Sequence, residues 1–485
     1  MNRELKRVSV LVLVMFLALF ISSTIIQFLE ADSLNADARN TRSLAETYKT
    51  QRGAVIIDGD PVASSTPVDD RYRYQRSYSN GPLYAPVTGY FTVGDQGSTG
   101  IEAAMNSYLS GTSDSQFFDQ INSLLTGQDP SGAAVELSID PAAQRAALTA
   151  LGDQRGAVIA IEPATGRILA MVSTPTYDPN ALASHDTAKV IDRYNTLLAA
   201  EGDPLINRTI AGDLYFPGST FKLIDASAAL ESGDYTMQSR FDNLSSLPLP
   251  QSDSAISNAG GGTCGSGDKV TIYVALQYSC NIPMAQLGME LGDDALRQMA
   301  ELYGFGQTIE VPMAATPSTY PAELDAAQTA LTAIGQYDVR VTPLQIAMVT
   351  SSIANDGELM QPTLVDRVIS PDLTTLEETQ PTVFSRPTST ATANAITEAM
   401  VASVTSGAAT NARIDGVEVA GKTGTAENGE GQPYTLWFTG FAPADDPQVA
   451  VAVVVENGAG QGQATFGNAV AAPIARAVIE AVLNE

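Results

Sequence analysis

The first pattern along the chain is an uninterrupted apolar run at residues 8–29 that contains no charged residue. A helix rises about 1.5 Å per residue, so a run of this length can cross a hydrocarbon core about 30 Å thick. Three basic residues precede the run and two acidic residues follow it closely. This charge bias predicts a cytoplasmic N-terminus and an extracytoplasmic remainder. The alternative is a cleaved signal peptide, whose apolar region is shorter and ends in small residues, so we favour a single membrane anchor.

Beyond the anchor, apolar residues follow both the strand and the helix period, which predicts a mixed α+β protein. Residues 71–91, rich in Tyr, Arg, Ser, Gly and Pro, are predicted to form loops. Predicted strands cover 51–57, 135–139, the hairpin 156–173, 436–443 and 448–457, and predicted helices cover 101–109, 141–151 and 472–483.

The order of these elements divides the chain into four parts. We expect a cytoplasmic tail at 1–7, the anchor at 8–29, a small mixed N-terminal domain at 30–150 and a larger domain at 151–485. Strands at both ends of the larger domain, with a helical middle, predict a central antiparallel sheet whose terminal segments pair and are flanked by helices.

The amino-acid composition argues against several classes of function. The net charge of −28 makes nucleic-acid binding improbable, because such a surface repels phosphate backbones. With one histidine and two cysteines, the chain does not favour a metal site, and we expect no metal or organic cofactor. A Ser-His-Asp triad would have to use His185, so acyl-transfer chemistry needs another base.

The two cysteines, Cys264 and Cys280, lie in the part of the chain predicted to be outside the cytoplasm. Disulfides persist in that environment, and an even cysteine count favours a bridge. A pair of unlinked thiols remains the alternative, because the sequence does not give their geometry.

A candidate nucleophile lies at Ser219, three residues before Lys222 at the start of an alanine-rich helical pattern. This spacing places both side chains on one helical face. A serine hydroxyl needs a neighbouring base, and a lysine serves as one only if burial or a second cation lowers its pKa. Asp225, three residues further on, either pairs with Lys222 or is a helix-surface carboxylate, and we favour the surface.

The second cation is offered by Lys422, in a strand-like stretch that continues with Thr423, Gly424 and Thr425. The two hydroxyls and the lysine charge suit a substrate carboxylate. Gly421 and Gly424 are expected to let a substrate backbone approach an edge strand.

Between these segments, Ser279 and Asn281 follow a helical pattern and supply a hydroxyl and an amide. The three motifs S-x-x-K, S-x-N and K-T-G, found in this order, are far less expected by chance than any one of them alone. A second S-x-x-K, Ser266 to Lys269, lies in a glycine-rich loop without a helix and is discarded.

This trio resembles the motifs of the penicillin-recognising serine acyltransferases, which include penicillin-binding proteins and serine β-lactamases. Longer stretches, among them TGIEAAMNSYLSG, GAVIAIEPATGRILAMVSTPTYDPN and IGQYDVRVTPLQIAMVTSSIANDG, resemble the class B (monofunctional) penicillin-binding proteins, and most of all the actinobacterial penicillin-binding protein A group. The resemblance implies that 30–150 is a pedestal or dimerisation domain and 151–485 a β-lactamase-like transpeptidase domain.

The resemblance also implies roles for the motif residues. Ser219 would attack the penultimate D-alanine of a peptidoglycan stem peptide, or a β-lactam, with Lys222 as the base. Ser279 would relay the proton, Asn281 would orient Lys222 and the substrate, and Lys422 would keep the site positive. Thr423, Gly424 and Thr425 would bind the substrate carboxylate, and the backbone N–H groups of Ser219 and Thr425 would form the oxyanion hole.

The implied protein is a D,D-transpeptidase of the cytoplasmic membrane that cross-links peptidoglycan and docks a SEDS-type glycan polymerase. Two other functions stay open: an inactive scaffold of a wall-synthesis complex, and a β-lactamase or β-lactam sensor. The intact motifs argue against the scaffold. The additional N-terminal domain, and the lack of a recognisable carboxylate for a deacylating water, argue against the β-lactamase.

Overall fold

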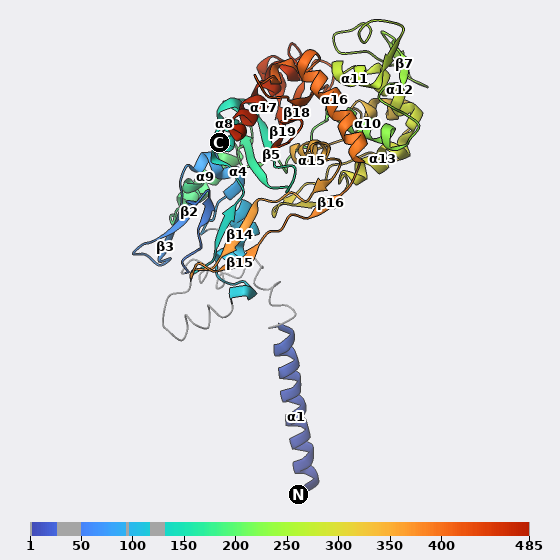
Figure 1. Cartoon of the computed structure of the whole chain (residues 1–485). Helices are drawn as coiled ribbons and strands as arrows, with labels where there is room; N and C mark the ends of the chain where they lie inside the picture. Colours follow the sequence, from blue (N-terminus) through green and yellow to red (C-terminus); the bar gives the residue numbers. More distant parts are fainter. Residues whose placement is uncertain (1, 27–49, 94–96, 117–130, 485) are drawn as a thin grey trace.

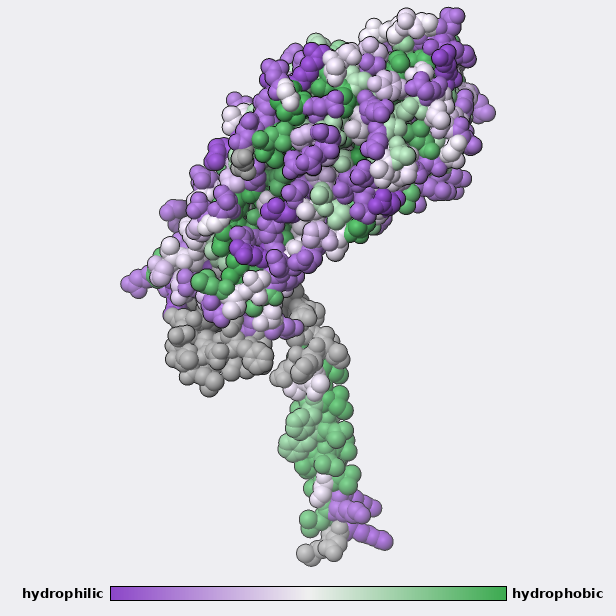
Figure 2. Space-filling model, in the orientation of Figure 1, coloured by the Kyte–Doolittle hydropathy of each residue, from purple (hydrophilic) through white to green (hydrophobic). Residues whose placement is uncertain are grey.

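The computed structural model describes residues 2–26, 50–93, 97–116 and 131–484. Its first element is α1 (Asn2–Thr24), an isolated helix whose described side chains are exposed. Figure 2 shows apolar side chains over most of its length. Within the described residues, Leu5–Thr24 is the segment long and apolar enough to cross a membrane. The final residues of the predicted anchor, 27–29, lie outside the described residues.

A five-stranded sheet forms the centre of the larger domain, in the order β17-β18-β19-β5-β6. Every pair in this sheet is antiparallel. The strands are β5 (Gly156–Ile161), β6 (Ile168–Thr174), β17 (Ala420–Ala426), β18 (Thr435–Ala442) and β19 (Val449–Val455). The β5–β19 pairing joins the two sequence ends of the domain, which confirms the predicted architecture.

Helices cover both faces of this sheet (Figure 1), which explains why β5 and β19 are apolar on both sides. On one face lie α8 (Pro141–Leu151) and α17 (Gly467–Leu483). Their buried side chains share a core cluster with alternate residues of β19, namely Val449, Val451, Val453 and Val455. On the other lies α15 (Pro343–Ala354), within the larger core cluster. Asp140 caps α8, since its carboxylate accepts from the Ala142 and Ala143 N–H groups, and the helix covers the predicted residues 141–151.

The helical middle of the domain packs around α10 (Lys222–Glu231), which is buried along almost its whole length. Its neighbours include α11 (Ile272–Tyr278), α12 (Ile282–Leu291), α13 (Asp293–Leu302) and α16 (Thr390–Ser406). α14 (Ala326–Ala333) packs on α12. These helices hold the start of α10 against β17 through a 3₁₀ turn at Gly218–Phe221.

A second sheet has six strands in the order β15-β14-β4-β1-β2-β3. Four strands belong to the N-terminal part of the chain: β1 (Val55–Ile57), β2 (Asp60–Pro67), β3 (Tyr74–Tyr78) and β4 (Ala134–Leu137). The other two, β14 (Val365–Ile369) and β15 (Thr375–Glu378), come from far along the chain, and β14 pairs with β4. The N-terminal sheet is thus completed by residues that a division at residue 150 assigns to the other domain.

The prediction of loops at 71–91 was wrong, because that segment contains β3 and α4 (Gly81–Thr88). The aromatic residues of β3 are not a loop signal here, since Tyr78 packs into the core. The predicted helix at 101–109 is two short helices, α5 (Gly100–Ala104) and α6 (Asn106–Leu109), joined at Met105.

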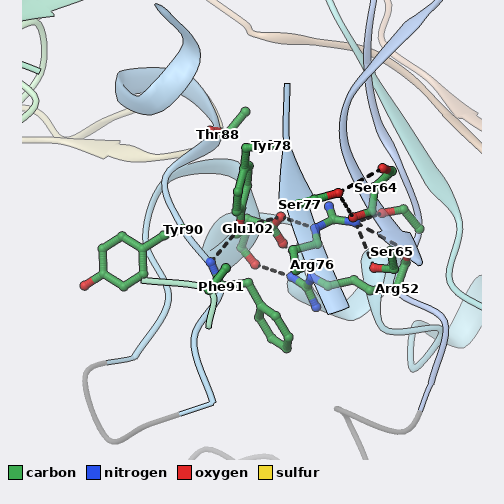
Figure 3. Close-up of polar contacts among 12 residues, drawn as sticks. Arg52, Ser64, Ser65, Arg76, Ser77, Tyr78, Thr88, Tyr90, Phe91 and Glu102 are labelled. Atoms are coloured by element: carbon green, nitrogen blue, oxygen red, sulfur yellow. Dashed lines mark hydrogen bonds and ion pairs between the residues drawn. The ribbon is translucent and has the colours of Figure 1, made fainter. Parts of the chain in front are cut away.

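A buried ionic network fixes this N-terminal unit (Figure 3). Arg52 Nε and Arg76 Nε lie 2.5 and 2.6 Å from the two carboxylate oxygens of Glu102, and all three side chains are 0–2% exposed. The Tyr78 hydroxyl lies 3.1 Å from the same carboxylate and accepts from the Phe91 N–H at 2.7 Å. Burial works to raise the pKa of Glu102, but the two guanidinium groups outweigh it and hold that pKa below its usual value.

We expect Glu102→Gln to destabilise this unit by about 3–5 kcal/mol, because it leaves two buried guanidinium groups without their counter-charge. Hydrogen–deuterium exchange of the full-length protein in detergent measures this as lost protection in the β1–β3 peptides. The control is Asp242→Asn, which removes an exposed ion pair to Lys269 and should cost about 0–1 kcal/mol. Unchanged protection in Glu102→Gln would mean that the network is not structural.

Candidate active site

The candidate nucleophile, Ser219, lies in the 3₁₀ turn that precedes α10, so it stands just ahead of the helix and not on its first turn. This turn is fixed by the Gly218 N–H, which donates to the Gly335 carbonyl at 2.9 Å. A Cβ atom at Gly335 would lie 1.9 Å from the Gly218 oxygen, so only glycine fits there.

Lys222 places its amine at the centre of the site. Its Nζ lies 2.9 Å from Ser219 Oγ, 2.8 Å from the Ser279 carbonyl oxygen and 2.7 Å from Asn281 Oδ1. The two carbonyl-type oxygens can only accept, and a neutral amine has two N–H donors and one lone pair. With both N–H groups given to those oxygens, the lone pair is left for the Ser219 hydroxyl proton.

The loop between α11 and α12 supplies these two acceptors. Ser279 ends α11 in the left-handed conformation (φ 61°), which directs its carbonyl to Lys222 while its hydroxyl lies 2.6 Å from Lys422 Nζ. Asn281 begins α12, and its Nδ2 donates to the Ser257 carbonyl at 2.9 Å. That bond assigns the amide orientation, because it leaves Oδ1 as the atom facing Lys222.

Lys422 lies on β17, the edge strand of the five-stranded sheet. Its Nζ also donates to the Thr423 carbonyl at 2.8 Å. Thr423 and Thr425 both line the cleft that contains Ser219. The structure therefore brings together the three motifs, which lie 60 and 143 residues apart in the sequence.

The two motif glycines act differently from the prediction. A Cβ atom at Gly424 would lie 2.8 Å from Trp437 Cβ and 3.1 Å from the Pro217 oxygen, and one at Gly421 would meet the Phe438 ring at 2.7 Å. Both glycines thus make room for protein packing, and Gly424 holds β17 against the serine turn. The expectation that they clear space for substrate was wrong in this respect.

Both lysines are fully buried, and burial is the main cause of their altered basicity. It lowers the pKa of Lys422 to about 7. It also lowers the pKa of Lys222 well below its ordinary value, with a further contribution from the Lys422 charge. These are the conditions under which a lysine becomes a base for a serine hydroxyl.

Asp225 is fully buried, which overturns its assignment to the helix surface. Neither carboxylate oxygen has a hydrogen-bond partner within the described part of the chain. Burial raises the pKa of Asp225 well above its usual value, and the Lys222 charge opposes that rise. Asp225 in turn works to raise the pKa of Lys222, against burial and Lys422.

The two cysteines are bridged, as favoured, with Cα atoms 5.8 Å apart. The bridge ties the glycine-rich loop before α11 to Cys280, the middle residue of S-x-N. Asn258 strengthens this link, because its Oδ1 accepts from the N–H groups of Asn281 and Ile282 at 2.9 and 3.0 Å. Sequence reasoning missed Asn258, which carries no motif signal.

A cleft of about 540 Å³ opens over Ser219. Its walls are the glycine-rich loop, the S-x-N loop, β17 and the start of α17. Residues that the sequence reasoning did not single out line it as well: Ser257, Asn258, Tyr278, Glu427, Tyr434, Phe466 and Asn468.

The sole histidine is not part of this site. His185 lies 2.5 Å from Asp70 of the N-terminal unit. Across the described ranges, no group of three His, Cys, Asp or Glu side chains has the arrangement of a metal site.

Comparison with known proteins agrees with this geometry. Residues 156–480 match the family "Penicillin binding protein transpeptidase domain", and residues 52–135 match "Penicillin binding protein A dimerisation domain". The chain is 42% identical to the peptidoglycan D,D-transpeptidase PbpA of Mycolicibacterium smegmatis, over the full length of both. It is 41% identical to PbpA of Mycobacterium tuberculosis, over 100% of this chain and 99% of that protein.

The chain belongs to the class B penicillin-binding proteins of the PbpA type.

Solved structures support this membership. Penicillin-binding protein A of M. tuberculosis, as a ceftriaxone acyl-enzyme complex, has a TM-score of 0.87 and 40% identity, covering 90% of this chain and 100% of that one. A D,D-transpeptidase domain from Eggerthella lenta has a TM-score of 0.77 and 31% identity, covering 90% of this chain and 99% of that one. This penicillin-binding protein is therefore an enzyme of the D,D-transpeptidase class, which confirms the predicted family and enzyme type.

We expect Asp225→Asn to change the pH dependence of acylation in this penicillin-binding protein. Removing the carboxylate charge removes a contribution that raises the pKa of Lys222. The free amine then persists to lower pH, so the acid limb of the rate of penicillin acylation should move to lower pH.

The control is Ser227→Ala on the same helix, which loses a buried contact to Tyr303 but no charge. It should leave the acid limb in place. An unmoved limb in Asp225→Asn would show that Asp225 carries no charge beside Lys222.

Proposed function

We propose that this chain forms an acyl-enzyme on Ser219 from a D-Ala-D-Ala stem peptide and passes the acyl group to an amine of a neighbouring stem peptide. The observation that carries the proposal is the position of Lys222 Nζ, 2.9 Å from Ser219 Oγ and fixed by two oxygen acceptors. The relatives named D,D-transpeptidases support the substrate class.

In the first half-reaction, Lys222 takes the hydroxyl proton as Ser219 Oγ bonds to the penultimate D-alanine carbonyl carbon. The carbon–nitrogen bond then breaks, and the proton passes to the departing D-alanine amine. Ser279 is the proposed relay, because its hydroxyl lies against Lys422 while its backbone carbonyl contacts Lys222.

The remaining roles follow from position along β17 and the serine turn. Lys422 keeps the site positive, Asn281 orients Lys222 and a substrate amide, and Thr423 and Thr425 hold the terminal carboxylate, with Gly424 placing them against the turn. The backbone N–H groups of Ser219 and Thr425 form the proposed oxyanion hole. Their proximity is supported by Gly218, where a Cβ atom would lie 2.9 Å from the Thr425 oxygen.

The same nucleophile accounts for acylation by β-lactams. Three solved structures of penicillin-binding protein A from M. tuberculosis are described as its acyl-enzyme complexes with ceftriaxone, imipenem and penicillin G. We propose that β-lactams occupy the donor position in this chain and acylate Ser219 in the same way.

We also propose that α1 anchors the chain in the cytoplasmic membrane, with the catalytic domain on the extracytoplasmic side. The basic residues before the apolar run and the apolar surface of α1 support this orientation. The N-terminal unit is then a pedestal or dimerisation domain. We propose that it and the anchor dock a SEDS-type glycan polymerase, on the strength of the family resemblance.

We expect wild-type protein incubated with penicillin G to gain the mass of one drug molecule and to keep it for hours. Ser219→Ala should gain none, because the hydroxyl that contacts Lys222 Nζ is then missing. Intact-mass spectrometry measures both. A transient adduct with steady drug hydrolysis would instead indicate a β-lactamase, and no adduct on folded wild-type protein would indicate an inactive scaffold.

A further inference from the structure

Three polar side chains follow one face of the edge strand. Thr423, Thr425 and Glu427 alternate along β17 and just beyond it, and all three line the cleft. Gly424 and Ala426, which lie between them, are buried away from the cleft. Alternate residues on a strand lie about 7 Å apart, so Glu427 stands one such step beyond Thr425.

Glu427 is held in place by its backbone while its side chain stays open to solvent. The Gln336 amide, in the orientation that satisfies both contacts, donates to the Glu427 carbonyl and accepts from its N–H at 3.2 Å each. Gln336 belongs to the loop that also fixes the serine turn through Gly335. The position of Glu427 relative to Ser219 is therefore set by one short segment.

The charge of Glu427 stands out in the cleft. It is the one charged residue among those that line the cleft, and the described residues give it no ion pair. The two active-site lysines are fully buried beneath the cleft and bonded to Ser219, Ser279, Asn281 and Thr423. An unpaired carboxylate here is available to a ligand.

That ligand is not the carboxylate end of the donor peptide, because two like charges on one strand face repel each other. A carboxylate recognises a cation, and the transferred acyl group needs an amine, which is an ammonium ion in neutral water. Among the participants in transpeptidation, the acceptor amine therefore complements this part of the cleft.

We propose that Glu427 recognises the acceptor: its carboxylate binds the ammonium group of the incoming stem peptide and brings it to the acyl-enzyme. This inference rests on the proposed function, since it assigns a residue to the second half-reaction. It makes Glu427 a specificity-determining residue for cationic acceptors, with no part in forming the acyl-enzyme.

The chemistry balances with the groups already described. The bound ammonium releases one proton to water, and the free amine nitrogen bonds to the ester carbon of the acyl-enzyme. The carbon–Oγ bond breaks, and the second amine proton passes through Lys222 to Ser219 Oγ. The products are a new amide and the free enzyme.

The test compares wild-type protein, Glu427→Gln and the control Glu430→Gln, all full-length in detergent. Glu430 is an exposed carboxylate three residues further on that does not line the cleft. The donor is a thioester analogue of the D-alanyl peptide. The acceptors are an N-acetylated L-Ala-γ-D-Glu-L-Lys peptide, whose side-chain amine is its only amine, and methanol, which is a neutral nucleophile.

We expect Glu427→Gln to need about 2–5 times more peptide for half-maximal transfer, as the loss of one solvent-exposed ion pair implies. Its acylation by penicillin and by the donor, and its transfer to methanol, should match wild type. In wild type, added salt should weaken peptide transfer because it screens the ion pair, and Glu427→Gln should lose this dependence. Glu430→Gln should behave as wild type.

Equal peptide transfer in Glu427→Gln and Glu430→Gln would overturn the inference and leave the proposed function intact. Slower hydrolysis of the acyl-enzyme in Glu427→Gln, with peptide transfer unchanged, would overturn it by making Glu427 a base for water. If wild-type protein acylates but transfers to no amine, the proposed function fails, and this inference fails with it.

Discussion

The catalytic half of this molecule depends on one constraint: two lysine amines are buried in the same site. Among the residues that the structure describes, neither amine has a carboxylate within hydrogen-bonding distance. Burying such groups is costly unless hydrogen bonds compensate. Here the compensation comes from the Ser279 and Thr423 backbone carbonyls, the Asn281 side chain and two hydroxyls. Carbonyl oxygens accept from a neutral amine as well as from a cation, so Lys222 keeps these hydrogen bonds when it acts as a base.

The surrounding fold serves to hold these acceptors still. The 3₁₀ turn and α10 bring Ser219 and Lys222, the loop between α11 and α12 brings Ser279 and Asn281, and the edge strand β17 brings Lys422. The disulfide and Asn258 fasten the second of these segments. A shift in any of the three would leave a buried amine without its partner, so packing and chemistry are stabilised by the same contacts.

The sequence was sufficient to predict those features of the fold and the site that short, contiguous motifs determine. The three motifs can be recognised from short stretches of sequence, and the helical pattern at 141–151 matches α8. Strands at both ends of the larger domain, with a helical middle, predict the antiparallel sheet whose terminal segments pair. It was not sufficient where tertiary packing decides. Asp225 looks like a surface residue in any helical projection, and only the packing of α10 against its neighbouring helices buries it. Likewise, nothing local shows that β14 pairs with β4, about 230 residues away.

The central claim is that burial lowers the pKa of Lys222, so that its amine removes the Ser219 proton. The most direct test is the second-order rate constant for penicillin acylation of wild-type protein, measured from pH 5 to pH 10. The account predicts that the rate levels off well below the pH at which an ordinary lysine loses its proton, because burial and the Lys422 charge lower the pKa of Lys222 well below its ordinary value. A rate that keeps rising tenfold per pH unit up to pH 10 would mean an ordinary lysine, and would contradict the account.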